Sequence, residues 1–110
     1  MTTLVEKACV PCKGGGEPLK GDRLVELSAF VPDWTVVERH RLTRTFKFPN
    51  FAKALAFVNG VGELAEQEQH HPDIRLSWGK VVIDLSTHKI GGLSENDFIL
   101  AAKIDILPRE

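Results

Sequence analysis

The chain has 110 residues, 43% of them hydrophobic, which is enough for one domain with one hydrophobic core. Its formal net charge of −1 lacks the cationic excess typical of nucleic-acid-binding proteins. The apolar stretches are far shorter than the roughly 20 residues that span a bilayer. The sequence does not open with a basic segment followed by an apolar one, so we expect a cytoplasmic protein with no membrane segment.

Residues 1–20 are expected to form a flexible arm, because three glycines and a proline within 14–18 interrupt regular structure. Cys9 and Cys12 in this arm have Cys-x-x-Cys spacing, but a zinc site normally needs four ligands and the sequence has no second such pair. We therefore expect an incidental or weakly structural pair in preference to a metal or redox centre. Recruitment of His70 and His71 to complete a zinc site stays an open alternative.

Residues 21–110 are expected to form a single domain. A short helix is predicted over Arg23–Phe30, and the alternating pattern of Trp34–Phe48 predicts two strands. Asn50 is a favourable N-cap for the longest helix, which is predicted from Phe51 to about Gln69.

The apolar side chains of this long helix form a wide stripe. Those expected to face the sheet are Phe51, Ala54, Leu55, Val58, Val61 and Ala65, with Phe57 and Leu64 on a neighbouring flank. Gly60 and Gly62 indicate close approach of another backbone, because glycine is unfavourable inside a helix. The stripe fits equally well one broad core face or a helix that packs on its own sheet and on another subunit.

The clearest hairpin joins the alternating segments Ile74–Trp78 and Val81–Leu85, with a type II′ turn expected at Gly79-Lys80. Ser94 is expected to cap a last helix over Glu95–Leu107. The predicted order is α-β-β-α-β-β-α. Such an order indicates an α+β fold, with a four-stranded antiparallel sheet and the helices packed on one face.

Three of the four histidines fall on two neighbouring segments. His70 and His71 are adjacent and precede Pro72, and His88 follows the last predicted strand. Imidazoles titrate near neutral pH, so such a group suits proton transfer. Glu66 lies one helical turn before His70, and the negative end of the helix dipole lies beside it. Both features favour a protonated His70 that acts as a general acid. His71 points another way and is free to contact a ligand.

The hairpin brings His88 back toward the other two histidines at one edge of the sheet. Ser86 and Thr87 add hydroxyl groups beside it and are expected to contact the same ligand. Trp78 lies at the other end of the hairpin, in the core or on a neighbouring surface. Asp97 occupies the third position of the last helix, where capping alone accounts for it.

Other interpretations are open for the same residues. Two adjacent histidines before a proline can simply end a helix in solvent, and His88 by itself can be a surface residue. Imidazole is also a common metal ligand, so the cluster could bind a metal with His88 or a carboxylate as the third ligand.

The combined spacing is Glu66-x3-His70-His71-Pro72-x5-Trp78-x9-His88-x8-Asp97. It resembles the pterin-4a-carbinolamine dehydratases, and the resemblance covers about residues 20–105. It implies a lyase that removes water from 4a-hydroxytetrahydropterin to give quinonoid dihydropterin, as part of tetrahydrobiopterin recycling. The resemblance also implies that the reaction needs no metal and no organic cofactor.

The resemblance further assigns roles to individual side chains. It implies that His70 and His88 are general acids for the two faces of the substrate. It implies that His71 mainly binds and orients the substrate, and that Glu66 and Asp97 position the imidazoles.

The same resemblance implies a homotetramer assembled through the helix at 51–69 and a functional link to an aromatic amino-acid hydroxylase. Two other functions stay open. One is a dehydratase-like protein that acts on another pterin, for example in molybdenum-cofactor metabolism. The other is a helix-mediated binding or coactivator module, for which three retained histidines would be unnecessary.

Overall fold

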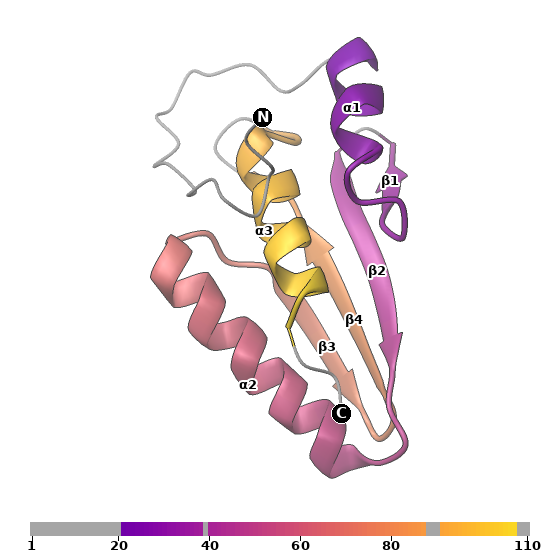
Figure 1. Cartoon of the computed structure of the whole chain (residues 1–110), viewed down its shortest axis with the longest axis vertical. Coiled ribbons are helices and arrows are strands. Elements are labelled where there is room, and N and C mark those ends of the chain that lie inside the picture. Colours follow the sequence, from indigo (N-terminus) through magenta and orange to yellow (C-terminus); the bar gives the residue numbers. More distant parts are fainter. Residues whose placement is uncertain (1–20, 39, 88–90, 108–110) are drawn as a thin grey trace.

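The structure, a computed structural model, describes residues 21–38, 40–87 and 91–107. Three helices cover one face of a four-stranded antiparallel sheet with strand order β1-β2-β4-β3 (Figure 1). The fold class and the order α-β-β-α-β-β-α predicted from the sequence are confirmed. The expectations for the arm at 1–20, with Cys9 and Cys12, and for His88 concern residues outside the described ones.

The elements have nearly the predicted bounds. The helices are α1 (Gly21–Ser28), α2 (Phe51–Glu68) and α3 (Glu95–Asp105). The strands are β1 (Thr35–Val37), β2 (Arg41–Lys47), β3 (Asp73–Ser77) and β4 (Lys80–Leu85). The side chain of Asn50 accepts a hydrogen bond from the Lys53 N–H at 2.9 Å, which confirms the predicted N-cap of α2.

The pairing register places apolar side chains together on the face that the helices cover. Leu42 lies opposite Leu85, Phe46 opposite Val81, and Ile74 opposite Ile83. Because side chains alternate along a strand, polar residues such as Thr43 and Thr45 occupy the open face.

The buried face of α2 is rotated from the predicted one. Its buried residues are Ala54, Phe57, Val61 and Ala65. Phe57, predicted on a flank, contacts Phe46 with ring centroids 4.7 Å apart, whereas Phe51 and Leu55 are 44% and 40% exposed. The small side chains of Ala54 and Ala65 let α2 lie close to the sheet, and the Phe57 ring fills the space between the helix and the sheet.

Gly60 and Gly62 in α2 make no close contact with another backbone among the described residues of this chain. There, a Cβ at Gly62 would meet nothing within 4 Å, and one at Gly60 would make ordinary contact with the Leu107 side chain at 3.9 Å. The expected close approach of a backbone from another subunit stays a prediction.

The β3–β4 turn differs by one residue from the prediction. Ser77 pairs with Lys80, so the turn residues are Trp78 and Gly79. Gly79 is needed because its backbone lies against Phe48: the Phe48 N–H donates to the Gly79 carbonyl at 2.9 Å, and a Cβ on Gly79 would lie 2.9 Å from the Phe48 carbonyl oxygen. Trp78 is 68% exposed, at the end of the hairpin away from His70 and His71.

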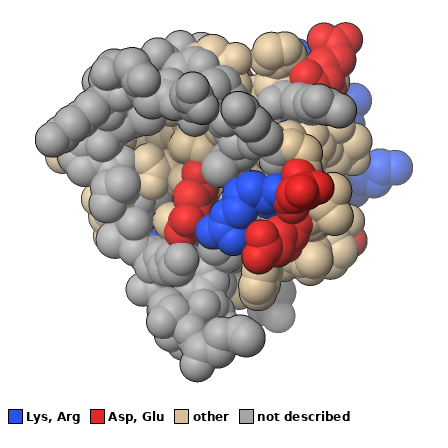
Figure 2. All heavy atoms as spheres, turned by 90° about the horizontal axis from the view of Figure 1, so that it is seen from above, with Lys and Arg blue, Asp and Glu red and all other residues tan. Residues whose placement is uncertain are grey.

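Charged side chains of opposite sign lie next to each other on the face seen in Figure 2. Ion pairs of this kind occur in the structure at Arg23, whose guanidinium lies 3.3 Å from Glu26 and 3.2 Å from Glu95. Among the described residues on this face, neither sign forms an extended patch. None of the helices in the described ranges combines the length and apolar character needed to cross a membrane.

Candidate active site

The two adjacent histidines leave the end of α2 in different directions. Gln69 adopts the left-handed conformation (φ 53°, ψ 39°), and the His70 N–H donates to the Ala65 carbonyl at 3.2 Å. This arrangement satisfies a carbonyl at a helix end and stops the helix. His70 therefore lies outside the helix, and Pro72 prevents the helix from resuming at His71.

This helix end makes the expected pair between Glu66 and His70 wrong. Because His70 has left the helix, the usual four-residue proximity of helical side chains does not apply. The Glu66 carboxylate instead contacts Nε2 of His71. The two side chains are 77% and 60% exposed, so this ion pair is solvated and the His71 ring remains accessible.

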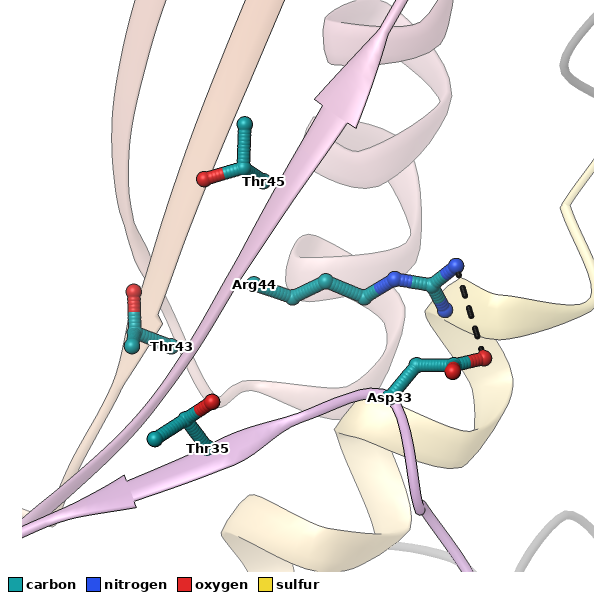
Figure 3. A pocket seen from close by; sticks show the side chains of 5 residues that line it. All are labelled: Asp33, Thr35, Thr43, Arg44 and Thr45. Atoms are coloured by element: carbon teal, nitrogen blue, oxygen red, sulfur yellow. Dashed lines mark ion pairs between the residues drawn. The ribbon is translucent and has the colours of Figure 1, made fainter.

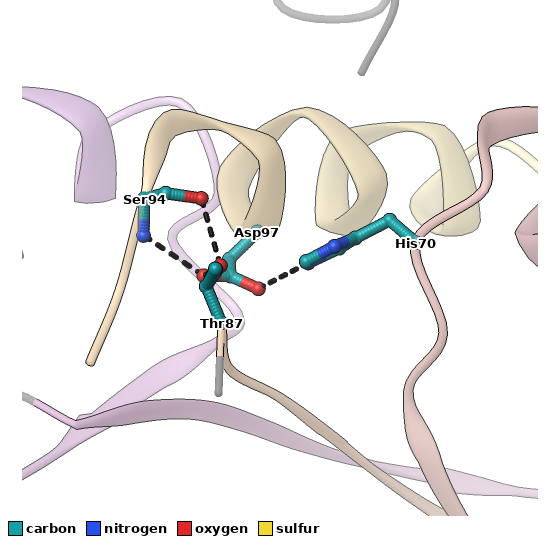
Figure 4. Close-up of polar contacts among 4 residues, drawn as sticks. All are labelled: His70, Thr87, Ser94 and Asp97. Carbon is teal, nitrogen blue, oxygen red and sulfur yellow. Dashed lines mark hydrogen bonds and ion pairs between the residues drawn. The ribbon is translucent and has the colours of Figure 1, made fainter. Parts of the chain in front are cut away.

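His70 turns toward the first turn of α3 and contacts Asp97. Its Nε2 lies 2.6 Å from Oδ1 of Asp97, and the two residues are 27 positions apart (Figure 4). The His70 side chain is 12% exposed and the Asp97 side chain is fully buried. An ion pair between Lys103 and Glu68, at 2.9 Å, joins α3 to the last turn of α2 and helps to keep His70 within reach.

The second carboxylate oxygen of Asp97 has two further partners. Oδ2 accepts the Ser94 N–H at 2.9 Å and the Thr87 hydroxyl at 2.8 Å (Figure 4). The predicted capping role of Asp97 is therefore present, and the same carboxylate also holds the imidazole. A buried charge is stable only when it is paired and hydrogen-bonded, and Asp97 has both kinds of partner.

Thr87, which we expected to contact a ligand, is only 4% exposed and lies beneath this network. Its backbone pairs with Gly92, with a Thr87 N–H to Gly92 carbonyl distance of 2.8 Å. Ser86 is half-buried and has greater access to solvent. His88 follows Thr87 in the sequence and is outside the described residues.

His40, which the sequence did not group with the other three histidines, contacts Gly91 between β4 and α3. Its Nδ1 lies 3.1 Å from the Gly91 carbonyl oxygen. The sequence carries no local signal for this contact, because the two residues are 51 positions apart. The sequence also carried no signal for the bond from the Thr87 hydroxyl to Asp97, whereas the Ser94-x-x-Asp97 capping pattern predicted the bond from the Ser94 N–H.

A hollow of about 340 Å³ lies elsewhere, beside the part of β2 that extends past β1. Figure 3 shows that Arg44 points toward α3 and Asp33, whereas Thr43 and Thr45 point to the other side of the strand. Arg44 is held by Asp105 at 2.6 Å. The hollow thus lies along the edge of β2 beyond the point where its pairing with β1 ends, and it is distinct from the histidine site. In the described part of the chain, no group of three His, Cys, Asp or Glu side chains could hold a metal ion.

The geometry brings His70, Asp97 and Thr87 together and leaves His71 with Glu66 on the surface nearby. A buried carboxylate bonded to one nitrogen of an imidazole fixes the orientation of the ring and supports a positive charge on it. Such a pair can donate or accept one proton at the other ring nitrogen. The arrangement therefore suits acid–base catalysis on a ligand.

Comparison with known proteins found a matching family profile and similar proteins. The profile of the family described as pterin 4 alpha carbinolamine dehydratase matches residues 17–107. A protein of Rubrobacter xylanophilus is 57% identical over 97% of this chain and 100% of its own length. One of Alkaliphilus metalliredigens is 53% identical over 96% of each chain. Both carry a provisional name as a pterin-4-alpha-carbinolamine dehydratase.

Two solved structures are also similar. The crystal structure of a transcriptional coactivator/pterin dehydratase from Brucella melitensis has a TM-score of 0.76 and 30% identity, covering 81% of this chain and 96% of that one. A pterin dehydratase-like protein, identified as a RuBisCO assembly factor in the alpha-carboxysome, has a TM-score of 0.57 and 25% identity. The similarity to this second structure covers 66% of this chain and 86% of that one.

Proposed function

The chain belongs to the pterin-4a-carbinolamine dehydratase family, and on this premise we propose that it dehydrates 4a-hydroxytetrahydropterin to quinonoid dihydropterin. The observation that carries the proposal is the contact between His70 and the buried Asp97, at 2.6 Å. A carboxylate in this position has a catalytic use, because it keeps an imidazole oriented and able to carry a proton.

The reaction breaks the bond between ring carbon 4a and its hydroxyl oxygen. A proton delivered to that oxygen lets it leave as water, and the lone pair of the adjacent ring nitrogen forms the new carbon–nitrogen double bond. The proton on that nitrogen is then removed, so that one proton is given and one is taken. Acid–base assistance of this kind typically accelerates a reaction about 10²–10⁴-fold.

In this proposal His70 and His88 deliver protons on the two faces of the pterin, with Asp97 behind His70. His71 binds and orients the substrate from the surface, with Glu66 as its partner. Ser86, which is half-buried, adds a polar contact to the substrate in this proposal. The physiological setting that we propose is cytoplasmic recycling of tetrahydrobiopterin beside an aromatic amino-acid hydroxylase, without a metal or an organic cofactor.

We also propose that the protein is a homotetramer assembled through α2. Phe51 and Leu55 lie one helical turn apart and are 44% and 40% exposed, which leaves an apolar strip on α2 that its own sheet does not cover. The same strip supports the second candidate function, a module that binds a partner helix. Retention of the buried His70–Asp97 pair favours the enzyme, because a binding module has no use for it.

A stopped-flow assay with freshly generated 4a-hydroxytetrahydropterin tests the proposal. The comparison is between wild type, the double variant His70→Ala, His88→Ala, and the control Gln67→Ala, which changes an exposed residue of α2. Wild type and the control should accelerate dehydration, and the double variant should lose about 10²–10⁴-fold. A double variant as fast as wild type would contradict the proposed acids. Inactive wild type would shift the function to another pterin or to the binding module.

A further inference from the structure

The hydrogen bonds around Asp97 have one consistent direction. An ionised carboxylate only accepts hydrogen bonds, and Oδ2 of Asp97 already accepts the Ser94 N–H at 2.9 Å. Thr87 Oγ1, at 2.8 Å from Oδ2, must therefore donate its single proton to Asp97. Thr87 Oγ1 also lies 2.8 Å from Ser94 Oγ, so in that contact the Ser94 hydroxyl donates and Thr87 accepts.

The same argument fixes the proton on His70. Nε2 lies 2.6 Å from Oδ1 of the acceptor carboxylate, so Nε2 must carry a hydrogen in both the neutral and the charged ring. Neutral His70 then has its lone pair on Nδ1. Within residues 21–38, 40–87 and 91–107, the structure gives Nδ1 of His70 no hydrogen-bond partner.

We propose that Thr87 is a positioning residue, which acts through Asp97 to hold the His70 proton on Nε2 and so makes Nδ1 the nitrogen that exchanges a proton with the pterin. The second half of this statement rests on the proposed function, whereas the location of the proton does not. In this proposal the buried Thr87 hydroxyl acts on the site through Asp97. This differs from the direct contact with the ligand that we expected from the sequence.

Thr87 is suited to this role because its position is fixed from several directions. It lies two residues past the end of β4, it is 4% exposed, and its backbone is paired with Gly92. Its hydroxyl has a donor on one side and an acceptor on the other, so it cannot rotate away without the loss of both bonds. Removal of the hydroxyl leaves Oδ2 of Asp97 with only the Ser94 N–H among the contacts described above.

Nitrogen-15 NMR of the histidine rings distinguishes the two neutral tautomers and tests the proposal directly. Four proteins are compared: wild type, Thr87→Val, Thr87→Ser, and the control Thr45→Val, which makes the same substitution at an exposed position of β2. Valine keeps the shape of threonine without its hydroxyl, and serine keeps the hydroxyl. The thermal midpoint of each variant is measured in parallel, so that signals are assigned only to folded protein.

We expect neutral His70 to be the Nε2–H tautomer in wild type, Thr87→Ser and Thr45→Val. In Thr87→Val the Asp97 carboxylate has lost the donor that fixes Oδ2, so it can turn and break its contact with Nε2 in part of the molecules. In those molecules the proton is no longer held on Nε2, so we expect a measurable fraction of the Nδ1–H tautomer and a kcat roughly tenfold lower with little change in KM, because one hydrogen bond to a charged group is lost. An Nδ1–H tautomer in wild type would overturn the proposal. So would a folded Thr87→Val with the wild-type tautomer and kcat.

The NMR result separates this inference from the proposed function, because it needs no turnover. A wild-type protein with the Nε2–H tautomer that fails to dehydrate the carbinolamine overturns the function and supports the hydrogen-bond direction. A protein that dehydrates the carbinolamine but has the Nδ1–H tautomer supports the function and overturns the hydrogen-bond direction.

Discussion

Replacement of Asp97 by asparagine should invert the proton arrangement of the site while it keeps the fold. The structure determines how the new amide must lie. Ser94 and Thr87 both donate to Oδ2, and His70 alone contacts Oδ1. The amide oxygen therefore stays toward the two donors, and the NH2 group faces Nε2 of His70. Because NH2 donates, Nε2 must become an acceptor, and the ring proton moves to Nδ1.

The expected magnitudes follow from the three hydrogen bonds. A hydrogen bond to a charged group contributes about 1.5–3 kcal/mol, and a neutral one about 0.5–1.5 kcal/mol. Each of the three bonds that change from the first kind to the second loses about 1–1.5 kcal/mol, so together they lower the free energy of unfolding by at most about 4.5 kcal/mol. The smaller cost of burying a neutral group offsets part of this loss. The rate should fall further, by about 10²–10⁴-fold, because neutral Nδ1–H can neither accept a proton nor act as a strong acid.

The measurements are kcat by stopped flow, the free energy of unfolding in urea, and the His70 tautomer by nitrogen-15 NMR. Asp22→Asn is the matched control, since Asp22 also lies in the first turn of a helix but is exposed. The control should resemble wild type in all three. An Asp97→Asn protein that keeps its rate to within about threefold would refute the argument, because that change is far below the acid–base contribution.

Two further predictions concern the surface of α2 and the β3–β4 turn. Phe51→Ser with Leu55→Ser should convert the proposed tetramer to smaller species in size-exclusion chromatography with light scattering; an unchanged mass would exclude this strip as the interface. Gly79→Ala should lower the free energy of unfolding by about 1–3 kcal/mol, because its Cβ would lie 2.9 Å from the Phe48 carbonyl oxygen. Unfolding in urea measures this value. A free energy of unfolding equal to that of wild type would show that the backbone at Gly79 and Phe48 can move apart without cost, and would contradict the prediction.

Much of the fold could be predicted because its signals are local. Alternation of polar and apolar residues identified the strands, and Asn50 and Ser94 marked the beginnings of α2 and α3. The rotation of α2 could not be predicted in the same way. Phe51 and Phe57 are equally apolar in sequence, and only the closeness of α2 to Phe46 places Phe57 in the core.

The sequence proposed candidate site residues but did not show which of them contact one another. The spacing of the motif singled out His70, His71 and Asp97 as candidates. The partner of each imidazole depends on Gln69, whose left-handed conformation ends the helix, and asparagine and glycine are the residues that usually signal such an end. The contact between His70 and Asp97 is set by how α3 packs beside the end of α2, which local sequence does not encode.

The most direct test of the account is the rate at which the wild-type protein dehydrates freshly generated 4a-hydroxytetrahydropterin, measured by stopped flow against the same solution without protein. The account predicts a saturable acceleration of at least about 10²-fold. A rate equal to the uncatalysed rate, from protein shown to be folded, would contradict the assignment of the histidine site to this reaction.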